Sequence, residues 1–133
     1  KLDVNGTGTI TNVKVNEKLI VSGTLSNAIF NDPTSAAVSL DYDVAAKSVV
    51  TFNSTGGNIT ITGFQNGVVG QKVTLINLSS SNILDLLRWF VGVGTQQLRF
   101  PTYPNATPIS LPQYGTATFV FDGLYWNCTD EVM

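Results

Sequence analysis

Apolar and polar residues alternate along most of the chain from about residue 31 onward, and a period of two is typical of half-buried β-strands. The alternation runs through residues 36–44, is strict through 58–62 and returns in 116–121. Two further runs, 48–52 and 72–78, are more continuously apolar. The second of these has apolar residues on both faces, so we predict a central strand there.

A β-hairpin is predicted close to the C-terminal end. Asp122-Gly123 is the strongest short turn signal in the chain, and the apolar residues after it supply the returning strand. Before the turn, Phe119 and Phe121 share one strand face, while Thr118 lies on the other. We therefore expect Phe119, Phe121 and Trp126 in the core and Thr118 outside it.

The spacing of these runs predicts the fold class. Turn signals recur roughly every 8 to 12 residues, which is typical of all-β domains. The composition is rich in β-branched residues and in turn formers, including 12 Gly. We predict an all-β module at residues 26–133, built as a β-sandwich, a jelly roll or a β-roll.

The first quarter of the chain contains a short internal repeat. Leu2–Thr7 returns seventeen residues later as Leu19–Thr24, and a weaker echo is present at Ile59–Gly63. Two copies and an echo are too few to predict a solenoid. Short strands of this kind cannot bury their apolar face alone. We expect residues 1–25 to form a strand-repeat attachment or shaft segment, covered by the later part of the chain or by neighbouring subunits.

Two segments depart from the strand pattern. Residues 82–90 suit one or two helical turns, with Asn82 as N-cap, and equally suit an apolar strand. Residues 101–108 contain three prolines, which predicts an extended loop.

Composition excludes several kinds of chemistry. The chain has no histidine, which rules out Ser-His-Asp and Cys-His catalysis and His-ligated zinc. Only 12% of residues are charged and the net charge is −2, which argues against nucleic-acid binding, because phosphate contacts need clustered cations. No apolar run is long enough to span a membrane, so we expect no membrane insertion.

Few residues remain as candidates for chemistry. Asp41 and Asp43 project from one strand face, and with Asp32 or a loop carbonyl they could bind Ca²⁺. Because Ca²⁺ sites normally need six to eight oxygen ligands, we expect instead that this strand face is solvated. A glycoside hydrolase needs two carboxyl groups about 5 to 9.5 Å apart, and this pair is the only obvious one. The single cysteine, Cys128, is expected to be a half-buried apolar residue. We therefore predict a non-enzymatic protein with no metal and no cofactor.

Three segments carry a resemblance to a known class of proteins. Residues 2–10 and 19–25 resemble the glycine-threonine strand repeats of bacteriophage fibre shafts. Residues 70–77, which begin Gly-Gln, and residues 115–126, which end in Asp-Gly-Leu-Tyr-Trp, resemble a strand pair found in fibre and receptor-binding proteins of tailed phages. The segment 82–108 departs from that pattern.

The resemblance implies a homotrimer that assembles with other capsid or tail proteins in the host cytoplasm and is exposed on the virion surface. Its role would be a tail fibre or capsid decoration that contributes to host attachment, with a host-surface glycan as a further partner. The alternative is an autonomous carbohydrate-binding β-sandwich. Residue types common at binding hot spots gather in the segment 82–108, and the candidate contacts are Arg88, Trp89, Phe90, Arg99 and Tyr103. Alternatively, the apolar side chains of this segment fill a trimer axis or anchor the protein on a neighbouring capsid protein, and these are Leu84, Leu87, Trp89 and Phe90.

Overall fold

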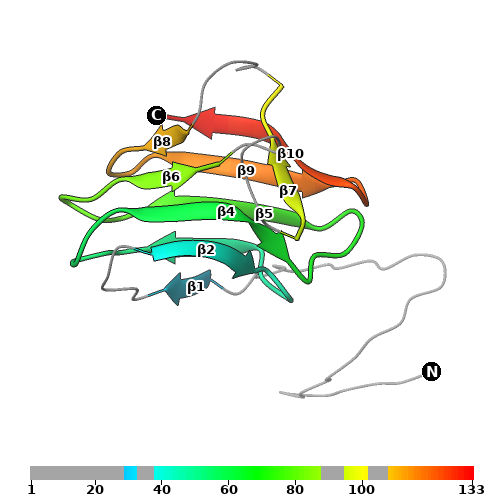
Figure 1. Ribbon diagram of the computed structural model, residues 1–133, viewed down its shortest axis with the longest axis horizontal. Helices are drawn as coiled ribbons and strands as arrows, with labels where there is room; N and C mark the ends of the chain where they lie inside the picture. The colour runs from blue at the N-terminus through cyan, green and yellow to red at the C-terminus, as the bar shows by residue number, and fades with distance from the viewer. Residues whose placement is uncertain (1–28, 33–37, 88–94, 102–107) are drawn as a thin grey trace, which may run out of the picture.

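The computed structural model describes residues 29–32, 38–87, 95–101 and 108–133, and all regular secondary structure in these residues is β-strand (Figure 1). The all-β prediction is therefore confirmed. The strands are β1 (Ile29–Asp32), β2 (Val38–Asp43), β3 (Val49–Phe52), β4 (Ile59–Gln65), β5 (Lys72–Asn77), β6 (Leu84–Leu86), β7 (Gln97–Arg99), β8 (Ile109–Leu111), β9 (Thr116–Phe121) and β10 (Tyr125–Val132).

The strands form two sheets, and successive strands from β1 to β6 alternate between them. One sheet has the order β1-β3-β5-β9-β10-β7 and the other has the order β2-β4-β6-β8. The first three strands of each sheet are parallel. The chain thus winds as a coil in which each turn contributes one strand to each sheet, and each sheet grows by stacking successive turns.

The pairing register gives the length of each turn of this coil. Ile29 pairs with Val49 and Val49 with Thr74, so one turn takes 20 residues and the next takes 25. In the other sheet, Val38 pairs with Ile59 and Ile59 with Leu84. The echo at Ile59–Gly63 lies in β4, inside this stack. The repeat at Leu2 and Leu19, and the whole segment 1–25, lie outside the described residues.

The last strands close the stack with antiparallel pairs. β8 lies antiparallel to β6, whereas β9 lies between β5 and β10 and is antiparallel to both. The hairpin prediction is confirmed, since Asp122 follows β9, Gly123 has a φ of 102° and β10 returns along β9. β5 is central between β3 and β9, as its apolar pattern predicted.

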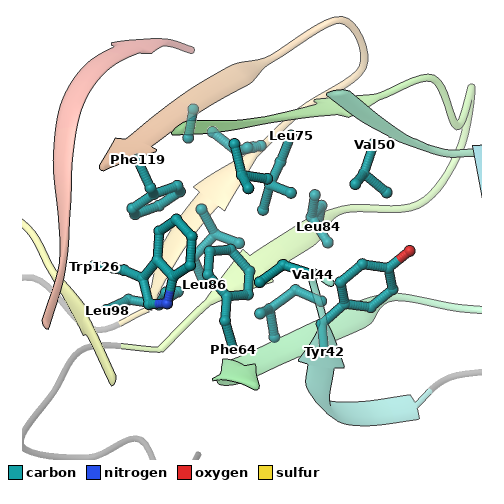
Figure 2. Packing of buried hydrophobic residues seen from close by; sticks show 14 of the residues in the cluster. Tyr42, Val44, Val50, Phe64, Leu75, Leu84, Leu86, Leu98, Phe119 and Trp126 are labelled. Carbon is teal, nitrogen blue, oxygen red and sulfur yellow. The ribbon is translucent and has the colours of Figure 1, made fainter. Parts of the chain in front are cut away.

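The core fills the space between the two sheets (Figure 2). Aromatic rings meet there from both sides: Phe64 of β4 lies 5.6 Å from Phe119 of β9 and 5.0 Å from Trp126 of β10, measured between ring centroids. At the other end, Tyr42 of β2 lies 5.2 Å from Phe52 of β3. Phe119, Phe121 and Trp126 are all buried, as predicted, and Thr118 is on the outer face.

The helical interpretation of residues 82–90 is wrong for Leu84–Leu86, which form β6. Leu84 and Leu86 are buried in the core, and the half-buried Asp85 between them accepts a hydrogen bond from Ser110 of β8. Pairing with β4 and β8 on either side supplies the hydrogen bonds that a helix would have made internally. Residues 88–90 lie outside the described residues.

A buried polar network holds the corner after β5. The Asn77 amide donates to the carbonyl oxygens of Leu111 (2.8 Å) and Asn82 (3.0 Å), and its oxygen accepts from the Ser79 N–H. The Ser79 hydroxyl donates to the Ser54 carbonyl of the preceding turn of the coil. These bonds satisfy backbone groups that would otherwise be buried without partners.

Candidate functional site

Of the five predicted contact residues, the structure describes Arg99. It is exposed at the end of β7, and its guanidinium carbon lies 5.8 Å from the centroid of the Tyr125 ring on β10. The pairing of β7 with β10 brings the two side chains together. Arg88, Trp89, Phe90 and Tyr103 lie outside the described residues.

The neighbouring hairpin adds a carboxylate to this surface. The Asp122 side chain accepts the N–H groups of Tyr125 and Leu124, each at 2.7 Å, and a bond from the Asn127 amide. These bonds, with the charge of Arg99, hold the pKa of Asp122 below its ordinary value. Arg99, Tyr125, Asn127 and Asp122 therefore form a small polar surface with a stacked aromatic ring and a fixed negative charge.

The outer face of β3, β5 and β9 is almost free of charge. Its outward side chains alternate with buried ones, and the Thr74 and Thr118 hydroxyls are hydrogen-bonded across the strands at 3.0 Å. Lys72, at the start of β5, is the only charged side chain on these three strands. The face comprises Val49, Thr51, Thr74, Ile76, Thr116, Thr118 and Val120.

A groove of about 610 Å³ lies between the β2–β3 turn and the β4–β5 loop. The Gln71 amide donates to the carbonyls of Val44 (2.7 Å) and Lys47 (2.9 Å), and its oxygen accepts the Val68 N–H. One side chain thus ties both walls together. The groove is lined by Ala45, Ala46, Lys47, Ser48, Asn66, Val68, Val69, Gly70, Gln71 and Lys72.

Exposed apolar side chains surround this groove. Val68, Val69 and Leu124 are 66%, 73% and 69% exposed. The tip of the β9–β10 hairpin reaches the β4–β5 loop, because a Cβ placed on Gly123 would lie 3.3 Å from Val69. Sequence reasoning missed this surface, because a Val-Val pair beside a turn signal gives no sign of whether it is buried.

A smaller groove of about 190 Å³ lies between residues 79–83 and the turn after β8. Its lining is mainly hydroxyl and amide groups, supplied by Ser80, Ser81 and Gln113 among others. Tyr114, next to Gln113, is 68% exposed and has a φ of 63°. A left-handed backbone is unusual for a bulky residue and often occurs at functional sites, so this turn is a candidate for binding.

The carboxylates singled out from the sequence, Asp41 and Asp43, bond to different neighbours. Among the described residues, no group of three or more Asp, Glu or Cys side chains lies close enough to hold a metal ion. Asp41 accepts two bonds from Thr95, while Asp43 accepts the Ala45 N–H of its own turn. The described residues also contain no helix long and apolar enough to cross a membrane.

Cys128 is half-buried and packs against the core, as predicted. Burial, together with the negative charge of Glu131, raises the pKa of the Cys128 thiol to about 12. The thiol is therefore protonated at neutral pH, and its role here is packing rather than nucleophilic chemistry.

The chain was also compared with known proteins. Its sequence matches no protein-family model, and no curated protein is significantly similar to it.

Proposed function

We propose that this protein is a non-enzymatic structural component of a bacteriophage particle, a trimeric fibre or a capsid or tail decoration that contributes to host attachment. The observation that carries the proposal is the two-sheet coil of parallel strands from β1 to β6. We interpret that coil, closed by β8 to β10, as a β-roll. A parallel stack of this kind extends by adding further turns, which suits a protein that spans distance on a particle.

The outer face of β3, β5 and β9 supports the trimeric part of this proposal. Its threonine, valine and isoleucine side chains are half-buried or buried and carry no carboxylate, so little desolvation opposes their burial against another copy. A face that meets solvent permanently usually carries more charge.

Molar mass in solution tests the trimer. Light scattering of the purified chain should give three times 14.2 kDa, unchanged by dilution over a hundredfold range. A stable monomer with the same β-sheet spectrum would contradict it. The particle location is tested by labelling intact virions with an antibody against the chain, and absence of label on particles would reject it.

Attachment is tested by variants in assembled particles. Replacing Arg99 and Tyr103 with alanine should leave trimers and incorporation intact and reduce adsorption to cells if these predicted contact residues bind a receptor. Loss of trimers or of the appendage would instead assign these residues an architectural role, and normal adsorption would remove them from the attachment surface.

A carbohydrate-binding module is the second candidate, and one observation favours it. The groove of about 190 Å³ is lined in part by Ser80, Ser81 and Gln113, and the 68% exposed Tyr114 directly follows Gln113 in the chain. A panel of neutral disaccharides, followed by saturation-transfer NMR, tests it. Binding that Tyr114→Ala abolishes and Tyr125→Ala preserves would support this site, and no binding by the wild-type chain would reject it.

A further inference from the structure

We propose that two patches of this chain dock onto each other between neighbouring copies. The turn patch consists of Val68, Val69 and Leu124 with Lys72. The tail patch consists of Val132 and Met133 with Asp130 and Glu131. This inference rests on the proposed trimer and adds a second contact to the one proposed across the outer face of β3, β5 and β9.

The turn patch has the composition of a protein contact. Its three apolar side chains are about two-thirds exposed or more, so their burial against a partner would be favourable. Lys72 lines the adjoining groove, and no carboxylate lines it. Lys47, on the other wall, is engaged within its own chain, because its ammonium donates to the Asp43 carbonyl at 2.6 Å and lies 5.4 Å from the centroid of the Tyr42 ring.

The turn patch is also rigid before any partner arrives. The Gln71 side chain bonds to backbone groups on both walls of the groove. The β4–β5 loop is further tied to β9, since the Gly70 N–H donates to the Phe121 carbonyl at 2.9 Å and the Phe121 N–H donates to the Gln71 carbonyl at 3.1 Å. A preformed surface loses little conformational entropy on binding.

The tail patch complements the turn patch in its apolar side chains and in its charge. Val132 and Met133 are 58% and 57% exposed, and with the three residues of the turn patch they make up five of the six most exposed large apolar side chains among the described residues. Asp130 is exposed and Glu131 is half-buried beside it. The acids and the two apolar side chains thus match Lys72 and the apolar side chains of the turn patch.

The two patches of one chain cannot reach each other. Leu124 precedes β10 and Val132 ends it, so eight strand residues, about 25 Å, separate them. Figure 1 shows the β9–β10 hairpin at one end of the sheets and the end of β10 at the other. A contact between two different patches is heterologous, and a one-third rotation between copies closes it into a ring of three.

A charge exchange between the patches tests this contact. Lys72→Glu and Asp130→Lys should each raise the trimer dissociation constant about tenfold or more at low salt, because each places like charges together. The double variant, K72E with D130K, should restore it to within about threefold of the wild type, because the pair is again opposite in sign. Analytical ultracentrifugation measures all three.

Thr55, exposed in the turn after β3, supplies the control. Thr55→Glu and Thr55→Lys make single charge changes at a residue that belongs to neither patch and should leave the trimer unchanged. Val69→Ser, at an exposed position, tests the apolar part and should weaken the trimer without changing the far-ultraviolet spectrum.

The outcomes separate this inference from the proposed function. A wild-type trimer that neither single charge variant weakens would overturn the docking and leave the trimer in place. Weakening by the single variants without rescue in the double variant would also overturn it. A monomeric wild type would overturn both proposals.

Discussion

Trp126 is the residue on which most of the core contacts at the β9–β10 end converge. Its ring packs against Phe64 and Phe121, and its N–H donates to the Gln96 side chain at 3.0 Å. Gly67 lies against the same ring, and a Cβ there would overlap the indole and lie 2.7 Å from the Gln96 side-chain oxygen. Glycine at this position therefore allows the β4–β5 loop to close over the tryptophan.

Gly67→Ala should lower the free energy of unfolding by about 2 to 3 kcal/mol, because the backbone or the indole must move. The near-ultraviolet circular dichroism of the tryptophan should change with it. Gly70→Ala is the control: it has open space and a φ of 82°, so only the left-handed backbone opposes it, at about 1 kcal/mol. An unchanged unfolding free energy for Gly67→Ala would show that the loop is loose.

Phe119→Ala should cost about 3 to 5 kcal/mol in urea unfolding, because the ring is fully buried and packs edge-on against Phe64 and Phe100. Thr118→Ala, on the opposite face of the same strand, removes only the bond to Thr74 and should cost about 1 kcal/mol in the isolated chain. Equal losses at both positions would mean that the assigned strand faces are incorrect.

The raised pKa of the Cys128 thiol predicts that the free energy of unfolding depends on pH in the alkaline range. The folded pKa of about 12 lies above the ordinary value of 9.0, so the folded chain holds this proton more tightly than the unfolded chain. The resulting stability is present below about pH 9 and is lost as the pH rises from 9 toward 12.

The difference in unfolding free energy between wild type and Cys128→Ala measures this loss, because the other titrating groups are common to both. The wild type should lose its relative stability between pH 9 and 11. At pH 8 the native thiol should react with iodoacetamide at least a hundredfold more slowly than the urea-unfolded thiol. Equal rates in the two states would contradict the burial of the sulfur.

At the scale of elements, the corners determine how one turn of the coil follows the next. The network of Asn77, Ser79 and Asn82 joins the end of β5 to the Ser54 carbonyl after β3. Asn77 also donates a hydrogen bond to the Leu111 carbonyl at the end of β8. One buried side chain therefore spaces strands of both sheets, which apolar packing alone does not specify.

Asn77→Asp should destabilise the protein by about 3 kcal/mol at pH 7, because a carboxylate would face two carbonyl oxygens in place of the amide donors. Folding then raises the pKa of the introduced carboxyl. The free-energy cost of ionising this carboxyl in the folded chain is absent below its pKa in the unfolded chain, about 4, and grows as the pH rises above that value. Chemical denaturation at pH 4 and 7 measures it, with the exposed Asn53→Asp as control. An equal loss at both pH values would contradict the donor role.

At the scale of the whole molecule, strands of both sheets contribute to one apolar core between them. The exposed apolar side chains of the turn patch and of the tail patch lie at opposite ends of β10, outside that core. In the proposed trimer, variants of these side chains should therefore alter association with little effect on stability.

Removal of residues 1–25 should leave the module folded, with a cooperative thermal transition within a few degrees of the full chain. Because we expect that segment to attach the module, trimer assembly or docking onto a particle should weaken. Loss of the cooperative transition would instead show that the first 25 residues belong to the sheets.

The sequence by itself determined where most strands lie and which of their faces is buried. Phe119 and Phe121 could be assigned to the core, and Asp122-Gly123 to a hairpin, because these features depend only on neighbours in the chain. Alternation of apolar residues is a local property, and it survives into the fold because each strand has one face toward the core.

The tertiary structure decided which strands pair and what remains exposed. The parallel partners Val49 and Thr74 are 25 residues apart, and no local pattern encodes that pairing. Residues 84–86 are too few to show a periodic pattern of apolar side chains. They form a strand because they pair with β4 on one side and β8 on the other. The exposure of Val68 and Val69 could not be predicted either, because elements distant in the sequence decide whether an apolar side chain is covered. Here the β9–β10 hairpin contacts the β4–β5 loop but leaves both valines exposed.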